Sequence, residues 1–439
     1  MSRVDAVRDW HRRHRFASGL AAGIVVGVVA TLLVSLAVSA VSAGRSDALP
    51  PGELVILSGR DDSLGGQRQL LIDQWNALHP ENTATIVELP GVADAQHSEM
   101  VARAQSGGHG VDIYNLDVTW TAEFAEAGYI RSLDESDLDT SGFLPNPLST
   151  CRYDGKLWAL PFNTDAGLLY YRTDLVGQPP GSWSQLRRTV EDVLARPTGG
   201  DPRVVAGHVG QLANYEGLTV NALESIQSAA AGAEVVRDGR VVVDMADLQE
   251  GVDRLRPTAG SPQIVLPDSL DYDEQRSTQA FRDGKVLFMR NWPVAYRTLS
   301  STPAGESSGQ RVPFGVVPLP GPSVLGGQNL AMARSSGNPR AAQALIEFLT
   351  DARSQQLLFE RGGLAATREI VYRDAAVGER YPYAGVLLQA VQRAHPRPVT
   401  PCYSAFSEAF RTAIDTALRD GEPLPGDFKE TLESVLRRC

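Results

Sequence analysis

The amino-acid sequence predicts an α/β fold in which strands alternate with helices. In the first third of the chain, short apolar runs end at turn residues, and segments with helical spacing lie between them. The length of 439 residues exceeds what one compact core usually holds, which indicates two domains or one domain with accessory segments. Hydrophobic residues at 43% and charged residues at 21% are typical of a globular protein.

The first third of the chain contains three predicted strands joined by helices. The strands are residues 53–58, 85–90 and 111–117, and the first helix carries Leu71, Trp75 and Leu78 on one face. The second helix ends at residues 106–108. Strand, helix and strand at this spacing indicate parallel pairing through crossover helices, which defines the α/β class.

The remainder of the chain continues the alternation. Strands are expected at residues 157–161, 168–171, 286–289 and 314–320, and helices at 183–195, 339–349, 351–360, 404–418 and 428–436. Ser182 and Gln185 form a capping box at the start of one helix, and Gly362 and Gly363 end another. No internal repeat, heptad run or low-complexity tract is present.

Charge and motif content exclude several classes of protein. The 41 basic and 52 acidic residues give a net charge of −11, which argues against a nucleic-acid binder. The three cysteines and seven histidines show no metal-ligand spacing. Asp61 stands where a serine nucleophile elbow around Ser63 would need its first glycine, and no phosphate-binding loop occurs. The sequence therefore indicates no catalytic residue, no metal and no cofactor.

A membrane-spanning segment is expected near the N-terminus. Residues 16–44 carry no charge, and about 20 apolar residues suffice to cross a bilayer. Five arginines precede this run, against two aspartates. Because positive charge stays on the cytoplasmic side, residues 1–15 are expected in the cytoplasm, 16–43 in the membrane as a signal-anchor, and 44–52 outside as a linker.

The alternative for this segment is a cleaved secretory signal. Residues 41–43 (Val-Ser-Ala) resemble a signal-peptidase site, and cleavage after Ala43 would release the protein. The apolar run is longer than the roughly 7–15 residues of a signal-peptide core, so a single-pass anchor is the favoured interpretation. Either way, the remaining chain is expected to work at the extracellular face of the membrane.

Five stretches of sequence, in order, carry a resemblance to a known family. They are Tyr153–Leu175 (YDGKLWALPFNTDAGLLYYRTDL), Phe281–Tyr296 (FRDGKVLFMRNWPVAY), Leu325–Met332 (LGGQNLAM), Arg361–Arg368 (RGGLAATR) and Arg397–Pro401 (RPVTP). Together they resemble the family 1 extracellular solute-binding proteins of sugar importers driven by ATP, and are most similar to the subgroup that binds trehalose and maltose. The similarity runs from about Glu53 to the C-terminus.

The resemblance implies a two-lobed, periplasmic-binding-protein-like fold of type II with an interlobe hinge. The first lobe would take residues 53–161 and 314–365, and the second lobe 162–313 and 366–439. The expected partners are a di- or oligosaccharide such as trehalose or maltose, the permease subunits of the transporter and, indirectly, its ATPase. The protein is expected to be a monomer that binds no nucleic acid and is attached to the membrane through its N-terminal helix.

The resemblance also assigns the sugar-binding residues. They are Asp61, Asp117, Asn163, Asp165, Glu274, Trp292, Gly326, Gly327, Gln328 and Arg397. Carboxylates, amides and an arginine suit paired sugar hydroxyls, and an indole suits the apolar face of the ring. The loop positions also follow the rule that α/β proteins bind ligands at the carboxyl ends of strands, since Asp61, Asp117 and the segment 163–165 each follow a predicted strand.

Each assignment competes with a structural role for the same residue. Asp117 could cap a helix over residues 118–127, and Asn163 and Asp165 could serve a turn after Pro161. Asp61 could be a solvated charge in a loop, and Glu274 could lie on the solvated face of a helix. Trp292 could be a core residue, and Arg397 could form a salt bridge within the protein. Gly326 and Gly327 could simply turn the chain. Tyr215 and Glu216 match another family segment and rank lower as contacts.

Two further features concern ligand identity and covalent structure. Gln328 stands where close maltose and trehalose binders often carry an aromatic residue, so one stacking platform is missing. Cys151 and Cys402 both map near hinge-side segments of the family, and in an oxidising exterior they are candidates for a disulfide; two free thiols are the alternative.

Two other functions compete with sugar capture. An extracellular glycoside-acting enzyme could use Asp117, Asp165 or the pair Asp61–Asp62 as its carboxylates. A sensory ectodomain could report sugar to a membrane partner, although only about fifteen residues would face the cytoplasm. Intact sugar after incubation separates the carrier from the enzyme.

Overall fold

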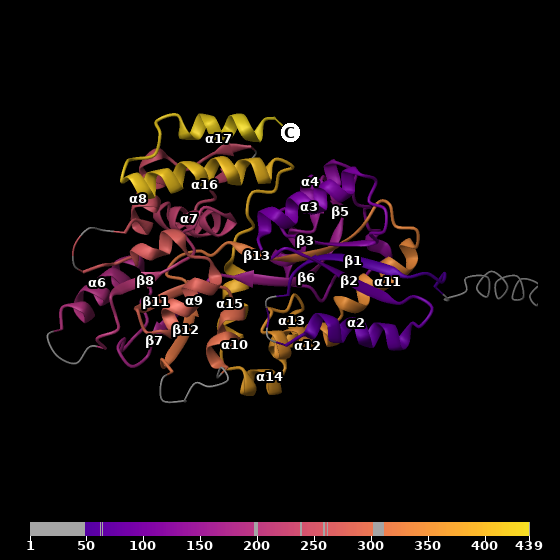
Figure 1. Ribbon diagram of the computed structural model, residues 1–439, viewed down its shortest axis with the longest axis horizontal. Coiled ribbons are helices and arrows are strands. Elements are labelled where there is room, and N and C mark those ends of the chain that lie inside the picture. The colour runs from indigo at the N-terminus through magenta and orange to yellow at the C-terminus, as the bar shows by residue number, and fades with distance from the viewer. Residues whose placement is uncertain are drawn as a thin grey trace, which may run out of the picture. The chain divides into compact units, whose positions relative to one another are not determined.

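The computed structural model describes residues 49–438 except residues 62, 64, 197–200, 238, 258–259, 261 and 302–310. Residues 51–439 form one compact unit. Within this unit the chain builds two lobes, each around its own sheet with helices on both sides (Figure 1). The predicted α/β architecture with two lobes is confirmed at this level.

The first lobe is built on a five-stranded sheet with the order β2-β1-β3-β13-β6. Its strands are β1 (Leu54–Gly59), β2 (Ala84–Leu89), β3 (Ile113–Asp117), β6 (Ala159–Ala166) and β13 (Leu325–Met332). Strand β1 pairs in parallel with β2 and β3, as the strand–helix–strand spacing predicts. Strand β13 is inserted antiparallel between β3 and β6, and it was not predicted as a strand from the sequence.

The second lobe is built on a four-stranded sheet with the order β12-β7-β11-β8. Its strands are β7 (Leu168–Arg172), β8 (Ala206–Val209), β11 (Val286–Asn291) and β12 (Phe314–Pro318). Strand β12 pairs with β7 from Phe314 to Pro318. The predicted start of the first lobe's second segment at residue 314 is therefore wrong, because the chain leaves the second sheet only after β12.

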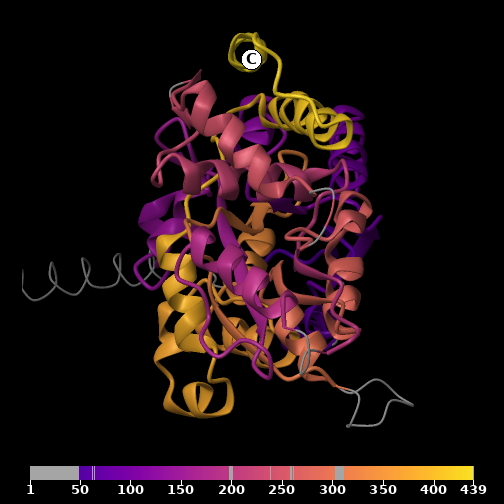
Figure 2. The same ribbon diagram turned by 90° about the vertical axis from the view of Figure 1, so that its left-hand side faces the viewer.

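The helices follow the strands closely in sequence. The helices up to residue 300 are α2 (Gln67–Leu78), α3 (Ala93–Gln105), α4 (Thr121–Glu126), α5 (Pro145–Ser149), α6 (Trp183–Leu194), α7 (Glu216–Ala229), α8 (Met245–Leu255), α9 (Glu274–Arg282) and α10 (Val294–Ser300). The later ones are α11 (Pro339–Leu349), α12 (Ala352–Leu357), α13 (Glu369–Arg373), α14 (Ala375–Arg380), α15 (Ala384–Arg393), α16 (Tyr403–Asp420) and α17 (Phe428–Leu436). Helix α16 packs on α7 and α8 in the second lobe, and α17 packs on α16 (Figures 1 and 2).

Local sequence explains several helix ends. The Ser182 hydroxyl accepts a hydrogen bond from the Gln185 backbone N–H at 3.2 Å, which confirms the cap predicted for α6. Asn338 caps α11 in the same way, with Pro339 in the first turn. Helix α16 ends at Gly421, whose φ of 75° lies in the left-handed region that favours glycine.

Three connections join the lobes. Gly167 links β6 to β7, residues 319–324 link β12 to β13, and residues 394–402 link α15 to α16. The second and third connections pair with each other, since the Leu325 N–H donates to the His395 carbonyl at 2.7 Å and the His395 N–H to the Ser323 carbonyl at 2.8 Å. The hinge is therefore a bundle of three neighbouring segments.

The predicted anchor at residues 16–43 lies outside the described residues. In the part of the chain that is described, no helix combines the length and apolarity that crossing a bilayer requires.

The predicted disulfide between Cys151 and Cys402 is wrong. Cys151 is a buried free thiol, whereas Cys402 is disulfide-bonded. The two residues belong to different lobes. Cys151 follows α5 under the first sheet, with its sulfur 3.9 Å from the Pro147 carbonyl, while Cys402 precedes α16 in the second lobe.

Alkylation of the unreduced protein is expected to distinguish these two cysteines. Burial raises the pKa of the Cys151 thiol, and the thiolate is the reactive form, so native protein should resist modification there. In denaturant without reductant, iodoacetamide should label Cys151 and leave Cys402 unmodified, as read by peptide mass spectrometry. Labelling of both residues without reductant would contradict the disulfide at Cys402.

Candidate functional site

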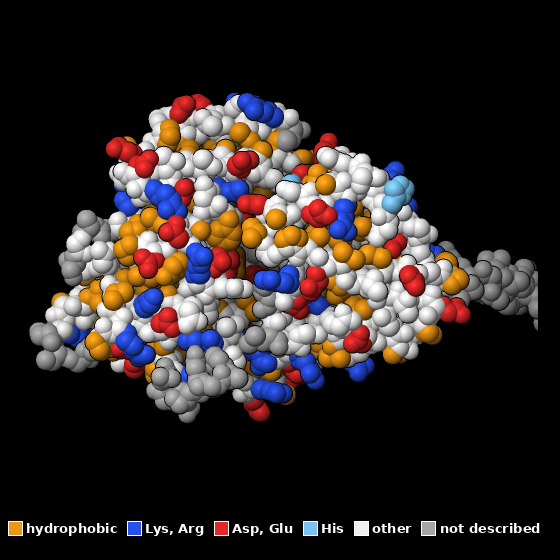
Figure 3. Space-filling view, viewed as in Figure 1, with side chains coloured by type: hydrophobic (Ala, Val, Ile, Leu, Met, Phe, Trp, Pro, Cys, Tyr) orange, Lys and Arg blue, Asp and Glu red, His pale blue; other side chains and the backbone are white. Residues whose placement is uncertain are grey.

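A cavity of about 1060 Å³ lies between the two lobes and is lined from both. Figure 3 shows the surface hollowed at this place, with acidic and basic side chains at the opening. The structure brings all ten predicted site residues to this cavity: Asp61, Asp117, Asn163, Asp165, Glu274, Trp292, Gly326, Gly327, Gln328 and Arg397. The volume is at the upper end of what ligand pockets usually have, near 1,000 Å³ by rough comparison.

Three polar side chains form a row across the floor of the cavity. Gln328 on β13 is the register partner of Asp117 on β3 and of Asn163 on β6. Residues opposite each other on adjacent strands have side chains about 5 Å apart on one face. Asp165 lies two residues beyond Asn163 on β6, opposite Gly326, so it extends the same face. The floor therefore presents carboxylate and amide groups side by side.

The two glycines of β13 allow this strand to pack closely against β6 and the Trp292 ring. A Cβ at Gly327 would lie 2.3 Å from the Asn163 carbonyl oxygen, and its φ of 114° already excludes most side chains. A Cβ at Gly326 would approach both Asp165 and the Trp292 ring at 3.1 Å. Since both residues lie inside β13, the alternative that they turn the chain is wrong.

Asp117 divides its two oxygens between the protein and the cavity. Its Oδ1 accepts hydrogen bonds from the Thr119 N–H at 3.0 Å and hydroxyl at 2.7 Å, and from Arg397 Nη2 at 2.9 Å. Its Oδ2 accepts none from the described residues. Helix α4 begins only at Thr121, with Trp120 at its N-cap position, so Asp117 does not cap it. One carboxylate oxygen is left for a ligand donor.

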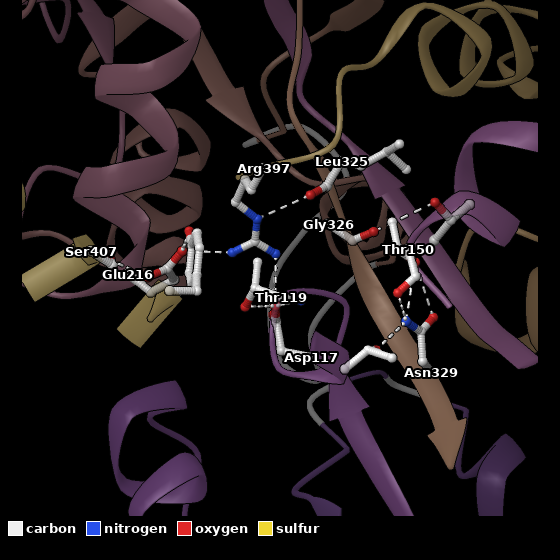
Figure 4. A network of polar contacts seen from close by, with 12 residues as sticks. Asp117, Thr119, Thr150, Glu216, Leu325, Gly326, Asn329, Arg397 and Ser407 are labelled. Carbon is white, nitrogen blue, oxygen red and sulfur yellow. Dashed lines mark hydrogen bonds and ion pairs between the residues drawn. The ribbon is translucent and has the colours of Figure 1, made fainter. Parts of the chain in front are cut away.

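Arg397 joins the two lobes through carboxylates on each side (Figure 4). It pairs with Asp117 of the first lobe at 2.9 Å and with Glu216 of α7 in the second lobe at 2.6 Å. Its Nε donates to the Leu325 carbonyl at 3.1 Å. The salt bridge considered as an alternative role is thus present, and three of the guanidinium donors are already used by the protein.

Burial determines the electrostatics around Arg397. It acts to lower the pKa of Arg397, but the Asp117 and Glu216 carboxylates raise that pKa well above its ordinary value. Burial also raises the pKa of Glu216, and the charge of Arg397 partly offsets this. Arg397 is therefore a permanent cation at the back of the cavity. Its partner Glu216 had been ranked low as a site residue in the sequence analysis.

Trp292 forms part of the cavity wall from the second lobe. Its indole N–H donates to Glu274 Oε1 at 3.2 Å, and the Tyr215 hydroxyl donates to Glu274 Oε2 at 2.7 Å. Glu274, the first residue of α9, thereby fixes two aromatic rings that both line the cavity. A solvated helix face does not describe this residue, which is half-buried between them.

Gln328 is held by two residues that were not predicted from the sequence. Its Oε1 accepts hydrogen bonds from Arg68 Nη2 at 2.7 Å and from Asn115 Nδ2 at 3.3 Å. Its amide nitrogen donates to none of the described residues and lies in the cavity lining. Arg68 lies 260 residues away in the sequence, so no local pattern could have indicated this contact.

Asp61 is engaged by its own loop. Its Oδ1 accepts from the Ser63 N–H at 3.0 Å and from the Ser63 hydroxyl, and its Oδ2 accepts from Gln67 Nε2 at 3.0 Å. This is turn chemistry at the start of α2. The carboxylate lines the cavity, but each of its oxygens already has a protein donor.

Asn163 and Asp165 have unused hydrogen-bonding capacity. The Asn163 side-chain oxygen is buried and has no partner among the described residues. The Asp165 carboxylate likewise accepts no hydrogen bond from any of them. Burial raises the pKa of Asp165 to about 7, with the charge of Arg290 opposing the shift. Buried polar groups without partners are costly, so these two residues favour a ligand that supplies hydroxyl donors.

Asp165 is expected to make the unliganded protein less stable as the pH rises. The folded state keeps its proton up to about pH 7, whereas the unfolded chain loses it near the ordinary value of 3.8. The folded state thus binds more protons in this interval, and the stability contribution is complete below the lower value and lost as pH rises through the upper one.

Asp165→Asn is the corresponding test, because asparagine imitates the protonated side chain. The two proteins should melt closest together near pH 4, and the variant should melt progressively higher than the native protein as the pH rises to about 7. Thermal unfolding measured from pH 4 to 8 checks this, and parallel curves for the two proteins would contradict it.

Comparison with known proteins gives consistent matches across the described chain. The sequence profile of the family described as bacterial extracellular solute-binding protein matches residues 71–382. A probable ABC transporter-binding protein of Deinococcus radiodurans is 31% identical over 83% of this chain and 88% of its own. The maltotriose-binding protein of Pyrococcus abyssi is 23% identical over 83% of this chain and 77% of its own.

Solved structures show the same fold. The maltose-bound MalE3 of T. maritima superimposes with a TM-score of 0.77 and 27% identity, covering 88% of this chain and 99% of that protein. The match includes both lobes, so the arrangement of two sheets around a hinge is shared.

Proposed function

We propose that this chain, which belongs to the bacterial extracellular solute-binding proteins, captures an oligosaccharide outside the cell and delivers it to an ABC importer. The observation that carries the proposal is the cavity of about 1060 Å³, which is lined by unused carboxylate and amide groups and by an indole. A saccharide has the complementary surface, with hydroxyls around its edge and apolar C–H groups on its face.

The polar floor supports recognition of hydroxyl pairs. Asp117 Oδ2, Asp165 and the Asn163 oxygen are acceptors, and the Gln328 amide nitrogen is a donor. A hydrogen bond to a charged group contributes about 1.5–3 kcal/mol net, and a ligand lacking that hydroxyl would leave the group unsatisfied. The Trp292 ring supplies a flat apolar surface at little cost in conformational entropy.

Ligand binding is coupled to hinge closure in this proposal. Because polar groups of both lobes line the cavity, a saccharide contacts both only when they approach each other. It therefore binds the closed state better and shifts the population toward that state. The closed form would dock on permease subunits, while ATP is hydrolysed in other subunits of the transporter.

A gluco-oligosaccharide of the maltose or trehalose type is the proposed ligand class. The cavity volume supports more than one sugar ring, and relatives are named for maltose and maltotriose. Gln328 lacks the stacking face of an aromatic residue and instead offers an amide. A ring above Gln328 would accordingly be held by its hydroxyls.

The proposed location is the extracellular face of the cell membrane. Support comes from the uncharged residues 16–44 and the arginines before them, which favour a single-pass anchor with the binding unit outside. Cleavage after Ala43 would release the same unit. A monomeric state is retained in this proposal, but the lobe boundaries are placed at the three hinge connections. The predicted boundaries at residues 161, 313 and 365 are corrected, because β6 continues the first sheet to Ala166, β12 belongs to the second sheet, and the last crossing comes at residues 394–402.

A thermal-shift screen of residues 45–439 against mono- and disaccharides and malto-oligosaccharides tests the function. A ligand that binds only the folded state stabilises it by about 2.7 kcal/mol at a hundred times its Kd. We expect a saturable rise in melting temperature with maltose, trehalose or maltotriose, and intact sugar on chromatography afterwards. Sugar cleavage would favour the glycoside-acting enzyme, and no shift with any sugar would contradict the proposal.

A further inference from the structure

The indole of Trp292 is supported from behind by a cation. The Arg290 guanidinium carbon lies 3.8 Å from the centroid of the Trp292 ring, which is the geometry of a cation–π contact. One face of the indole is therefore covered by Arg290, while the residue still lines the cavity. The ring edge rests against Gly326 of β13. A sugar can stack only on the face that Arg290 leaves open.

Arg290 is itself fixed by a buried acid. Its Nε and Nη2 donate to the two oxygens of Glu224 on α7, each at 2.8 Å, and its Nη1 donates to Gln211 Oε1 at 3.2 Å. Both members of the pair are buried, with side chains 2% and 3% exposed. A bidentate pair of this kind defines the plane of the guanidinium as well as its position.

Glu224 continues the chain of contacts into the hinge. Its Oε1 also accepts from the Ser323 hydroxyl at 2.9 Å and from the Val324 N–H at 3.3 Å. The Ser323 hydroxyl oxygen in turn accepts from the Gly167 N–H at 2.6 Å. Gly167 is the first connection between the lobes, and Ser323 and Val324 belong to the second. One buried carboxylate thus contacts both.

Gly167 has no space for a side chain against this pair. A Cβ there would lie 2.6 Å from Glu224 Oε1 and 3.0 Å from Arg290 Nε. The hinge backbone and the ion pair are therefore in direct contact. A rotation of the chain at Gly167 or Ser323 must displace Glu224, and with it the guanidinium beneath the indole.

We propose that Arg290 and Glu224 are positioning residues that couple the stacking face of Trp292 to the hinge. The inference rests on the proposed function, since it concerns how a stacked sugar favours closure. A ligand shifts a conformational equilibrium only through contacts that differ between the two states. The pair supplies such a difference, because the orientation of the indole depends on the same carboxylate that holds both hinge segments.

Two arginines of the second sheet provide a matched comparison. Arg172 on β7 is 1% exposed and makes two hydrogen bonds to Asp174 and one to Asp201, but it lies outside the cavity lining. Arg290→Lys and Arg172→Lys both keep a charge and lose the planar fork. We expect both variants to melt lower, but only Arg290→Lys to weaken sugar binding, by about tenfold or more.

A second variant separates positioning from folding. Replacing a buried ion pair by apolar residues of similar volume often preserves stability, so Glu224→Met/Arg290→Met should fold. In saturating sugar, a distance measured between spin labels on the two lobes should show incomplete closure in this variant and full closure in Arg172→Lys. Unchanged affinity and full closure in the folded double variant would overturn the proposal.

The geometry can also be followed without ligand. In protein labelled with 5-fluorotryptophan, the ¹⁹F signal missing from Trp292→Phe identifies Trp292. This signal should shift in Arg290→Lys and in the double variant, and should stay in place in Arg172→Lys. A signal unmoved in the first two would overturn the positioning role. Absence of sugar binding by the native protein would instead refute the proposed function, so the two failures are distinguishable.

Discussion

Replacing Trp292 by alanine is expected to weaken sugar binding by about thirtyfold to a thousandfold, corresponding to roughly 2–4 kcal/mol. The variant loses the flat apolar surface that remains open to the cavity after Arg290 has covered the other face. It also leaves Glu274 without the indole donor and exposes the Arg290 guanidinium. The thermal shift produced by the best sugar of the screen should disappear, and titration calorimetry should show the loss of affinity directly.

Trp158→Ala is the matched control for this experiment. Trp158 is half-buried and its indole N–H donates to the Tyr153 carbonyl at 2.9 Å, but it does not line the cavity. We expect this variant to lose some stability and to keep its sugar affinity. If Trp292→Ala folds and binds as tightly as the control, the indole is not part of the site.

Replacing Asp117 by alanine is expected to reduce affinity by about tenfold to a hundredfold, the effect of losing one hydrogen bond to a charged group. The change removes the unused Oδ2 from the cavity floor and one of the two carboxylates on Arg397. Arg397 keeps Glu216 at 2.6 Å and the Leu325 carbonyl at 3.1 Å. Because the cation retains these partners, the protein should remain folded, which circular dichroism and a cooperative melt would verify.

Asp139→Ala separates the role of Asp117 in the site from its role in the turn. Asp139 accepts hydrogen bonds from the Ser141 N–H at 3.1 Å and hydroxyl at 2.6 Å, as Asp117 does from Thr119. It lies on the exposed surface away from the cavity. The control should bind sugar normally. An equal loss of affinity in both variants would show that the defect lies in turn geometry rather than in ligand contact.

The predicted strands were most accurate where apolar runs are continuous. The run at residues 53–58 became β1, which lies between the parallel strands β2 and β3 and is mostly buried, so it is apolar on both faces. The runs at 85–90 and 111–117 became β2 and β3. Strand β13 has two glycines, Gln328 and Asn329 among its eight residues. It was missed because it combines a polar cavity floor with close strand packing, and neither produces an apolar pattern.

The site residues could be named from the sequence, but their contacts could not. All ten line one cavity, because motif similarity preserves position along the chain. Arg397 was expected to reach a hydroxyl, yet it is bound between Asp117 and Glu216. These partners lie 280 and 181 residues away, and a carboxylate at such a separation leaves no local signal in one sequence.

Most strands of the two sheets and several helices could be predicted from local hydrophobic periodicity, capping and turn chemistry, all of which act over a few residues. The side chains at the cleft were named by the similarity of motifs to a known family, not by these local signals. How these groups are used depends on the three-dimensional fold: which carboxylate oxygen stays open, which arginine supports the indole, and which cysteine remains a thiol. Those outcomes depend on burial and on contacts between distant segments. The energies of these contacts arise only in the folded protein, where the segments lie side by side.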